Sequence, residues 1–181
     1  MPTIPSSRSQ FTIRHAVRAA ILTLLFCTPA LSQTLPPPVY VASLAGPRFG
    51  VTFLAPGVVE KLAARDIQVN SNISQFGWQF EKQFYAKGGG VTMVTEWVAL
   101  LGGLDQGVAL PSLNWLVGLR TREGAEFGIG PNITPNGTGL VLAGGVTLRA
   151  GAMNVPLNVA VVPSKSGARV SFLAGFSLRR P

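Results

Sequence analysis

The stretch SQFGWQFEKQF, residues 74–84, decides which fold this sequence favours. Its apolar side chains recur at every second position: Phe76, Trp78, Phe80 and, beyond Lys82, Phe84. Because successive side chains of a β-strand point to opposite faces, this spacing predicts a strand with one aromatic face and one polar face. The aromatic face would form the core of a soluble protein, whereas in a membrane barrel it would face lipid.

Seven further segments have strand-like composition and are bounded by turn-forming glycine, proline, asparagine and aspartate residues. They span residues 47–55, 91–101, 112–121, 124–131, 138–149, 153–162 and 167–179. The segment 91–101 alternates poorly, because Glu96 lies among apolar neighbours. Residues 55–67, APGVVEKLAARDI, predict a short amphipathic helix. The chain is therefore predicted to be all-β: an eight-stranded antiparallel up-and-down barrel with one short helix between strands 1 and 2.

The first 32 residues have the pattern of a secretory signal peptide, with basic residues, an apolar run and small residues before a predicted cut after Ser32. The apolar run AAILTLLFCTPALS is 14 residues long, shorter than the ~20 residues that a membrane-spanning helix needs. An N-terminal membrane anchor is therefore the less favoured alternative. Residues 33–46 contain a proline run and are predicted to be a linker into the barrel domain, residues 47–181.

Removal of the signal peptide restricts the chemistry of the mature chain. The only cysteine, Cys27, and the only histidine, His15, both leave with it. Disulfides, thiolate nucleophiles, Cys/His zinc sites and histidine general bases are therefore excluded, and no cofactor or metal is expected. From Gln33 onward the chain has 12 Lys and Arg and 7 Asp and Glu, a net charge of +5. These basic residues are scattered, so no nucleic-acid partner is expected.

The composition of the polar faces favours lipid outside the barrel. These faces combine small and amide residues with a few charges of both signs, which suits a narrow interior. The candidates for an interior polar network are Arg48, Glu81, Glu96, Arg120, Glu126 and Arg169. The candidates for lipid-facing aromatic residues are Phe76, Trp78, Phe80, Trp115, Phe172 and Phe176. Strand lengths near ten residues and a charged fraction of only 12% agree with this interpretation, which predicts a packed polar interior.

Period-two alternation is the same when the sheet is turned inside out, so a soluble alternative stays open. In that alternative the chain is a secreted lipocalin-like β-barrel or β-sandwich that binds a small apolar ligand. A third hypothesis, an acid/base enzyme, requires two carboxylates within reach of one substrate, and Glu81 and Glu126 are the pair considered. The favoured hypothesis is a non-enzymatic barrel with a structural or binding role.

The chain resembles the small eight-stranded outer-membrane β-barrel proteins of bacteria in its signal peptide, its strand number and a last strand of alternating apolar residues, and the similarity covers about residues 47 to 180. The resemblance implies an outer-membrane location, rather than the periplasm or secretion. It also implies contact with outer-membrane lipid and with barrel-assembly machinery during biogenesis. Both chain ends would be periplasmic and the 55–67 helix would face outside. The chain departs from the family at its end, which runs past Leu178 into Arg179, Arg180 and Pro181, and in lacking large adhesive loops.

Overall fold

The computed structural model describes residues 43–87 and 90–178. The predicted signal peptide, most of the predicted linker and the last three residues lie outside the described residues.

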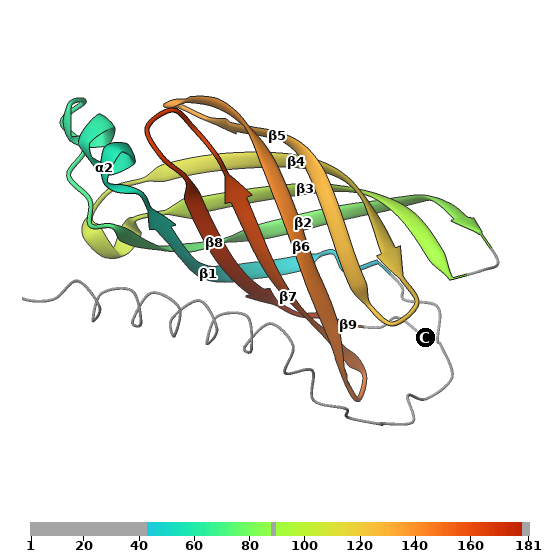
Figure 1. The fold of residues 1–181 in the computed structure, drawn as a ribbon. Coiled ribbons are helices and arrows are strands. Elements are labelled where there is room, and N and C mark those ends of the chain that lie inside the picture. The colour runs from blue at the N-terminus through green and yellow to red at the C-terminus, as the bar shows by residue number, and fades with distance from the viewer. Residues whose placement is uncertain (1–42, 88–89, 179–181) are drawn as a thin grey trace, which may run out of the picture. The chain divides into compact units, whose positions relative to one another are not determined.

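Eight antiparallel strands close into a barrel, which confirms the predicted fold class (Figure 1). The elements in chain order are β1 (Gly46–Leu54), α2 (Pro56–Ala63), β2 (Asn72–Lys87), β3 (Val91–Gly102), η1 (Leu104–Gln106), β4 (Leu110–Thr121), β5 (Ala125–Thr134), β6 (Gly137–Ala150), β7 (Met153–Val162), β8 (Arg169–Gly175) and β9 (Ser177–Leu178). Each of the strands β1 to β7 pairs with the next one, and β1 pairs with β8 to close the sheet. The short β9 continues β8 beyond Phe176 and pairs with β7.

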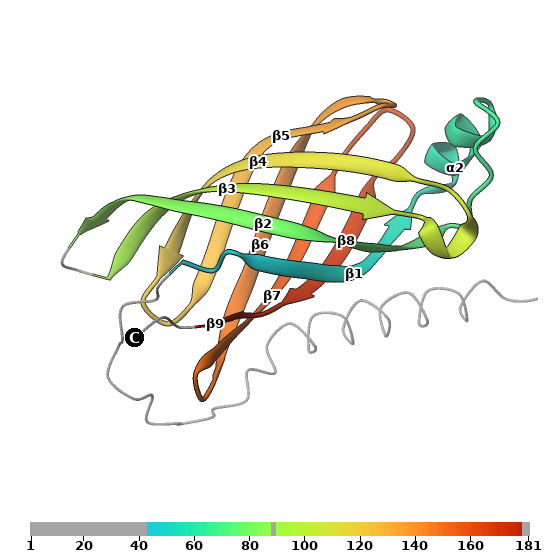
Figure 2. The same ribbon diagram turned by 180° about the vertical axis from the view of Figure 1, so that it is seen from behind.

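The up-and-down order gives the barrel two different ends (Figures 1 and 2). At the α2 end lie α2, η1 and the turns that join β5 to β6 and β7 to β8. At the opposite end, here called the terminal end, lie the start of β1, β9 and the connections β2–β3, β4–β5 and β6–β7. The first strand of the barrel therefore starts, and its last strand finishes, at the same end of the barrel, the terminal end.

The helix between β1 and β2 is present but shorter than the predicted 55–67. It begins at Pro56, a favoured first helical residue because proline has no N–H to satisfy there. It ends at Ala63, because Asp66 adopts the left-handed conformation (φ 60°) and the Ile67 N–H turns back to the Leu62 carbonyl. Residues 64–67 form the turn that leads the chain back toward the sheet.

One side chain of α2 anchors the helix to the barrel. Leu62 is buried against Leu54 of β1 and Ile73 of β2, with Val58 and Val59 packed around them. The helix thereby contributes an apolar cover to part of the α2 end.

The aromatic face of β2 lies on the outside of the barrel. Phe76, Trp78 and Phe80 are 52%, 48% and 55% exposed, and Gln79 between them is 3% exposed and faces the lumen. Large exposed apolar side chains continue over the outward positions of all eight strands. Among strand residues whose side chains are described, Lys82 is the only charged one on this outer face. The outer surface is therefore almost uniformly apolar.

The interior is not wholly the packed polar one predicted from the sequence. Six inward side chains form an apolar belt: Val98, Leu100, Leu116, Val141, Val162 and Leu173. This belt explains the poor alternation of the segment 91–101, because β3 is apolar on its outer face and, over half its length, on its inner face as well. Polar and charged side chains are buried on either side of the belt.

Candidate functional site

The centre of the polar interior at the terminal end is Arg120 of β4, which is 2% exposed. Its Nη1 and Nη2 atoms donate to the two carboxylate oxygens of Glu81 at 2.7 and 2.6 Å. Nη2 also donates to Glu96 at 3.1 Å, and Nε and Nη2 donate to Glu126 Oε2 at 2.9 and 2.8 Å. These residues come from four consecutive strands, β2 to β5, and together they form the Arg120 cluster.

The Arg120 cluster satisfies charges that would be costly to bury alone. The bidentate pairing with Glu81 is the strong geometry for a guanidinium and a carboxylate. Asn158 of β7 donates its side-chain amide to Glu126 and extends the cluster toward the far wall. Glu81 and Glu126 do approach each other, but both are bound to Arg120 rather than aimed at a common open space. This arrangement is suited to holding the barrel together, since each carboxylate is engaged by the same cation.

Arg48 of β1 forms a second, separate polar group at the terminal end. It is 1% exposed and donates to Gln79 Oε1 at 3.0 Å, to the Pro47 carbonyl at 2.9 Å and to the Leu44 carbonyl at 2.7 Å. Gly175 of β8 makes room for it, because a Cβ atom there would lie 2.8 Å from Arg48 Cδ. Leu44, which precedes β1, is fully buried and helps to fill this end of the lumen.

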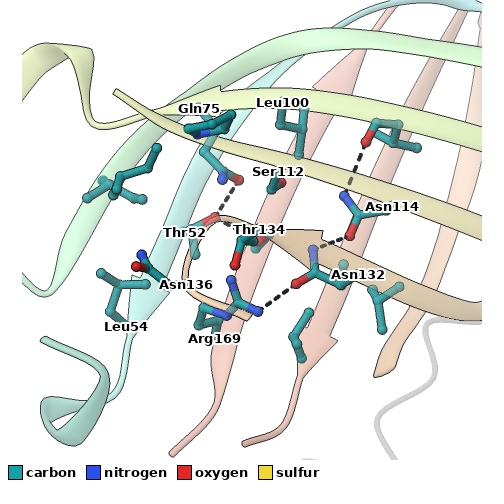
Figure 3. Close-up of a pocket in the computed structure, with 18 of the residues that line it drawn as sticks. Thr52, Leu54, Gln75, Leu100, Ser112, Asn114, Asn132, Thr134, Asn136 and Arg169 are labelled. Atoms are coloured by element: carbon teal, nitrogen blue, oxygen red, sulfur yellow. Dashed lines mark hydrogen bonds between the residues drawn. The ribbon is translucent and has the colours of Figure 1, made fainter. Parts of the chain in front are cut away.

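Arg169 of β8 belongs to neither group and lies toward the α2 end (Figure 3). Its Nη2 atom donates to Asn132 Oδ1 of β5 at 2.6 Å, which takes the side chain across the lumen. Asn132 donates in turn to Asn114 Oδ1 at 2.8 Å, and Asn114 donates to the Val98 carbonyl at 3.3 Å. The six charged residues predicted to share one network are thus divided among three places.

A cavity of about 220 Å³ occupies the lumen between the Arg120 cluster and the α2 end. All six residues of the apolar belt line it, together with Ala143 and Ala160. Its floor includes Gln79, Glu96 and Asn158, and its lining reaches Lys61 and Leu62 of α2. Arg169, Asn132 and Asn114, joined by hydrogen bonds, are part of its lining (Figure 3).

Sequence reasoning missed this cavity and did not name as site residues the amides that line it, among them Asn114, Asn132 and Asn158. A signal was present, because inward positions of β3, β4, β6 and β8 carry large aliphatic residues instead of polar ones. Where several strands each carry an aliphatic residue on an otherwise polar face, the pattern indicates an apolar belt within the lumen.

The outer face also satisfies its few polar groups. Trp97 and Trp115 stack at a centroid distance of 5.1 Å near the middle of β3 and β4. The Trp115 indole N–H donates to the Thr95 hydroxyl at 2.9 Å, and that hydroxyl donates to the Leu116 carbonyl at 3.2 Å. Phe172 and Phe176, the remaining predicted lipid-facing aromatics, are likewise exposed on the outer face.

Within residues 43–87 and 90–178, no group of three or more His, Cys, Asp or Glu side chains is arranged to hold a metal ion. In the same part of the chain, no helix has the length and apolar character to cross a membrane. Comparisons with known protein families, with curated proteins and with solved structures return no match for this chain.

Proposed function

We propose that this protein is a non-enzymatic β-barrel of the bacterial outer membrane with a binding role, and that its binding site is the cavity at the α2 end. The observation that carries the proposal is the inverted polarity of the barrel. Its outer face is apolar on every strand, whereas its lumen holds the Arg120 cluster and Arg48.

The inverted polarity favours lipid as the surroundings of the barrel. Apolar surface in water is unfavourable in proportion to its area, by roughly 25 cal/mol per Å². A soluble lipocalin-like barrel avoids this cost by facing its aromatic residues inward, but here Phe76, Trp78 and Phe80 face outward. The outward Lys82 is compatible with lipid, because a long lysine side chain reaches toward the membrane–water interface.

The filling of the terminal end favours binding over conduction. The Arg120 cluster closes the cavity floor, to which its member Glu96 belongs, and Arg48 with the buried Leu44 fills the lumen at the start of β1. An eight-stranded barrel has an interior only wide enough for side chains or for one small ligand. We therefore infer a cavity closed at the terminal end and reached from the α2 end.

The first test is location. In cells that express the full chain, the protein should be recovered in the outer-membrane fraction, and boiled and unboiled samples should migrate differently in a denaturing gel. Recovery in the soluble periplasmic or culture fraction would overturn the proposal.

A pair of variants tests which face meets lipid. Phe80→Arg places a charge in the apolar outer face and is expected to cost about 2–4 kcal/mol at the bilayer midplane, so that insertion falls sharply. Leu104→Arg is the matched control, because Leu104 is similarly exposed but lies in η1, outside the strands. Equal insertion of both variants would contradict a lipid-facing outer surface.

A further inference from the structure

We propose that the cavity binds a small amphipathic monoanion, with its negative group on Arg169 and a compact apolar body against the belt. This inference rests on the proposed function in that it names the ligand class of the same cavity.

The charge of Arg169 is unpaired. Among the described residues no carboxylate lies within 4 Å of its guanidinium, and its one hydrogen bond goes to the neutral amide of Asn132. Arg120, by contrast, contacts three carboxylates. A partly buried guanidinium without a counter-charge is unfavourable, and an anion that enters the cavity supplies the missing charge.

The charges around the cavity favour an anion over a cation. Three charged residues line it: Lys61, Glu96 and Arg169. Glu96 lies at the floor and shares the Arg120 guanidinium with Glu81 and Glu126, so the negative charge gathers at the floor and not at the α2 end. Lys61 and Arg169 both lie toward the α2 end, and their combined field attracts a negative group to that end of the cavity.

The apolar belt defines the rest of the ligand. On β8 the inward positions after Arg169 are Ser171 and then Leu173, so the wall becomes apolar from the α2 end toward the floor. A volume of about 220 Å³ exceeds the roughly 150 Å³ of an apolar cavity known to accept benzene. The space therefore accommodates one ring or a short aliphatic chain beneath a single charged group.

Two buried polar atoms at the floor have no partner. They are Gln79 Nε2, a donor, and Asn158 Oδ1, an acceptor. Both residues line the cavity, so a polar substituent at the far end of the ligand, or water beneath it, can satisfy them.

The test uses three single-ring probes of similar size and different charge. Benzoate, benzamide and benzylammonium are titrated by calorimetry into the folded full-length protein, whose fold is checked by the gel-mobility difference between boiled and unboiled samples. Benzoate should bind at least tenfold more tightly than benzamide, because a charge-assisted hydrogen bond is about twice as strong as a neutral one. Benzylammonium should bind most weakly.

Matched variants locate the binding. Arg169→Gln should remove the preference for benzoate over benzamide, whereas Arg65→Gln, at an exposed arginine of the α2 end, should keep it. Ala143→Phe should fill the cavity and abolish binding of both probes, whereas Ala99→Phe adds the same bulk to the outer face and should leave binding unchanged.

Three results would overturn the inference. They are equal affinity for benzoate and benzamide, no binding of benzoate to the folded barrel, and equal loss of preference in the two arginine variants. None of them affects the proposed membrane location, which fractionation tests separately. Conversely, a soluble protein that still prefers benzoate would overturn the location and leave the ligand class supported.

Discussion

The two halves of the lumen differ in how fully their arginine side chains are paired. In the terminal half, Arg120 is engaged by three carboxylates and Arg48 by one amide and two carbonyl oxygens. In the α2 half, Arg169 has one neutral partner and faces open space. The terminal half therefore uses the hydrogen-bonding capacity of its buried arginines within the protein, whereas the α2 half leaves part of it unused, and the proposed ligand site rests on that difference.

Loss of the Arg120 guanidinium is expected to have the largest effect on stability. Arg120→Met leaves three buried carboxylates facing one another, and the free energy of unfolding should fall by about 3–5 kcal/mol. Urea titration of the barrel in lipid vesicles measures it. A loss below about 1 kcal/mol would mean that the cluster does not hold the terminal half together.

The carboxylates of the Arg120 cluster should differ in their importance. Glu81 accepts two short hydrogen bonds from Arg120, whereas Glu96 accepts one at 3.1 Å. Glu81→Gln should therefore cost about 1.5–3 kcal/mol, the range for a hydrogen bond to a charged group. Glu96→Gln should cost less, because it also reduces the excess of carboxylates around one guanidinium. The reverse order in urea titrations would contradict the geometry of the cluster.

Removing the charge of Arg169 should change ligand binding but have little effect on stability. Arg169→Gln eliminates a partly buried cation without a counter-charge, so the free energy of unfolding should change by less than about 1 kcal/mol or should increase. Selective binding of benzoate should be lost in the same variant. A destabilisation as large as that of Arg120→Met would place Arg169 with the architecture instead.

The smallest expected effect on stability comes from a hydrogen bond outside the lumen, between Ser74 of β2 and Asp105 of η1. The Ser74 hydroxyl donates to Asp105 Oδ1 at 2.5 Å and holds the pKa of that carboxyl below its usual value. A lowered pKa stabilises the fold above the ordinary titration range of aspartate, and the contribution is lost as the pH falls through the lowered pKa. Ser74→Ala should raise the pKa of Asp105 in an NMR titration, while the pKa of Glu123, at the other end of the barrel, should not move.

The strands were predictable because their signal is local. Alternation in the segment 74–84 indicated which residues share a face, and the turn residues between segments placed the boundaries within a few positions of those observed. The helix was predicted too long, because its end depends on the left-handed conformation of Asp66 and on the packing of Leu62 against β1 and β2.

The site was predictable only in part. The sequence identified the six charged residues of the polar faces, but it treated them as one network. Which of them meet is decided across the lumen, as when Arg169 of β8 reaches Asn132 of β5. The aliphatic belt was also hidden, because Val141 and Leu173 lie on different strands and become one wall only when the sheet closes.

By itself, the sequence determined the number of strands and their order, which the short connections imply. It also divided the residues of each strand into two sets, one for each face of the sheet. The tertiary structure decided which set faces inward, which charges pair and where space remains. The physical reason is that alternation is a property of one strand and is unchanged when the sheet is turned inside out. Pairing and cavity volume, in contrast, depend on the register with which β1 meets β8 and on the side chains that closure brings together.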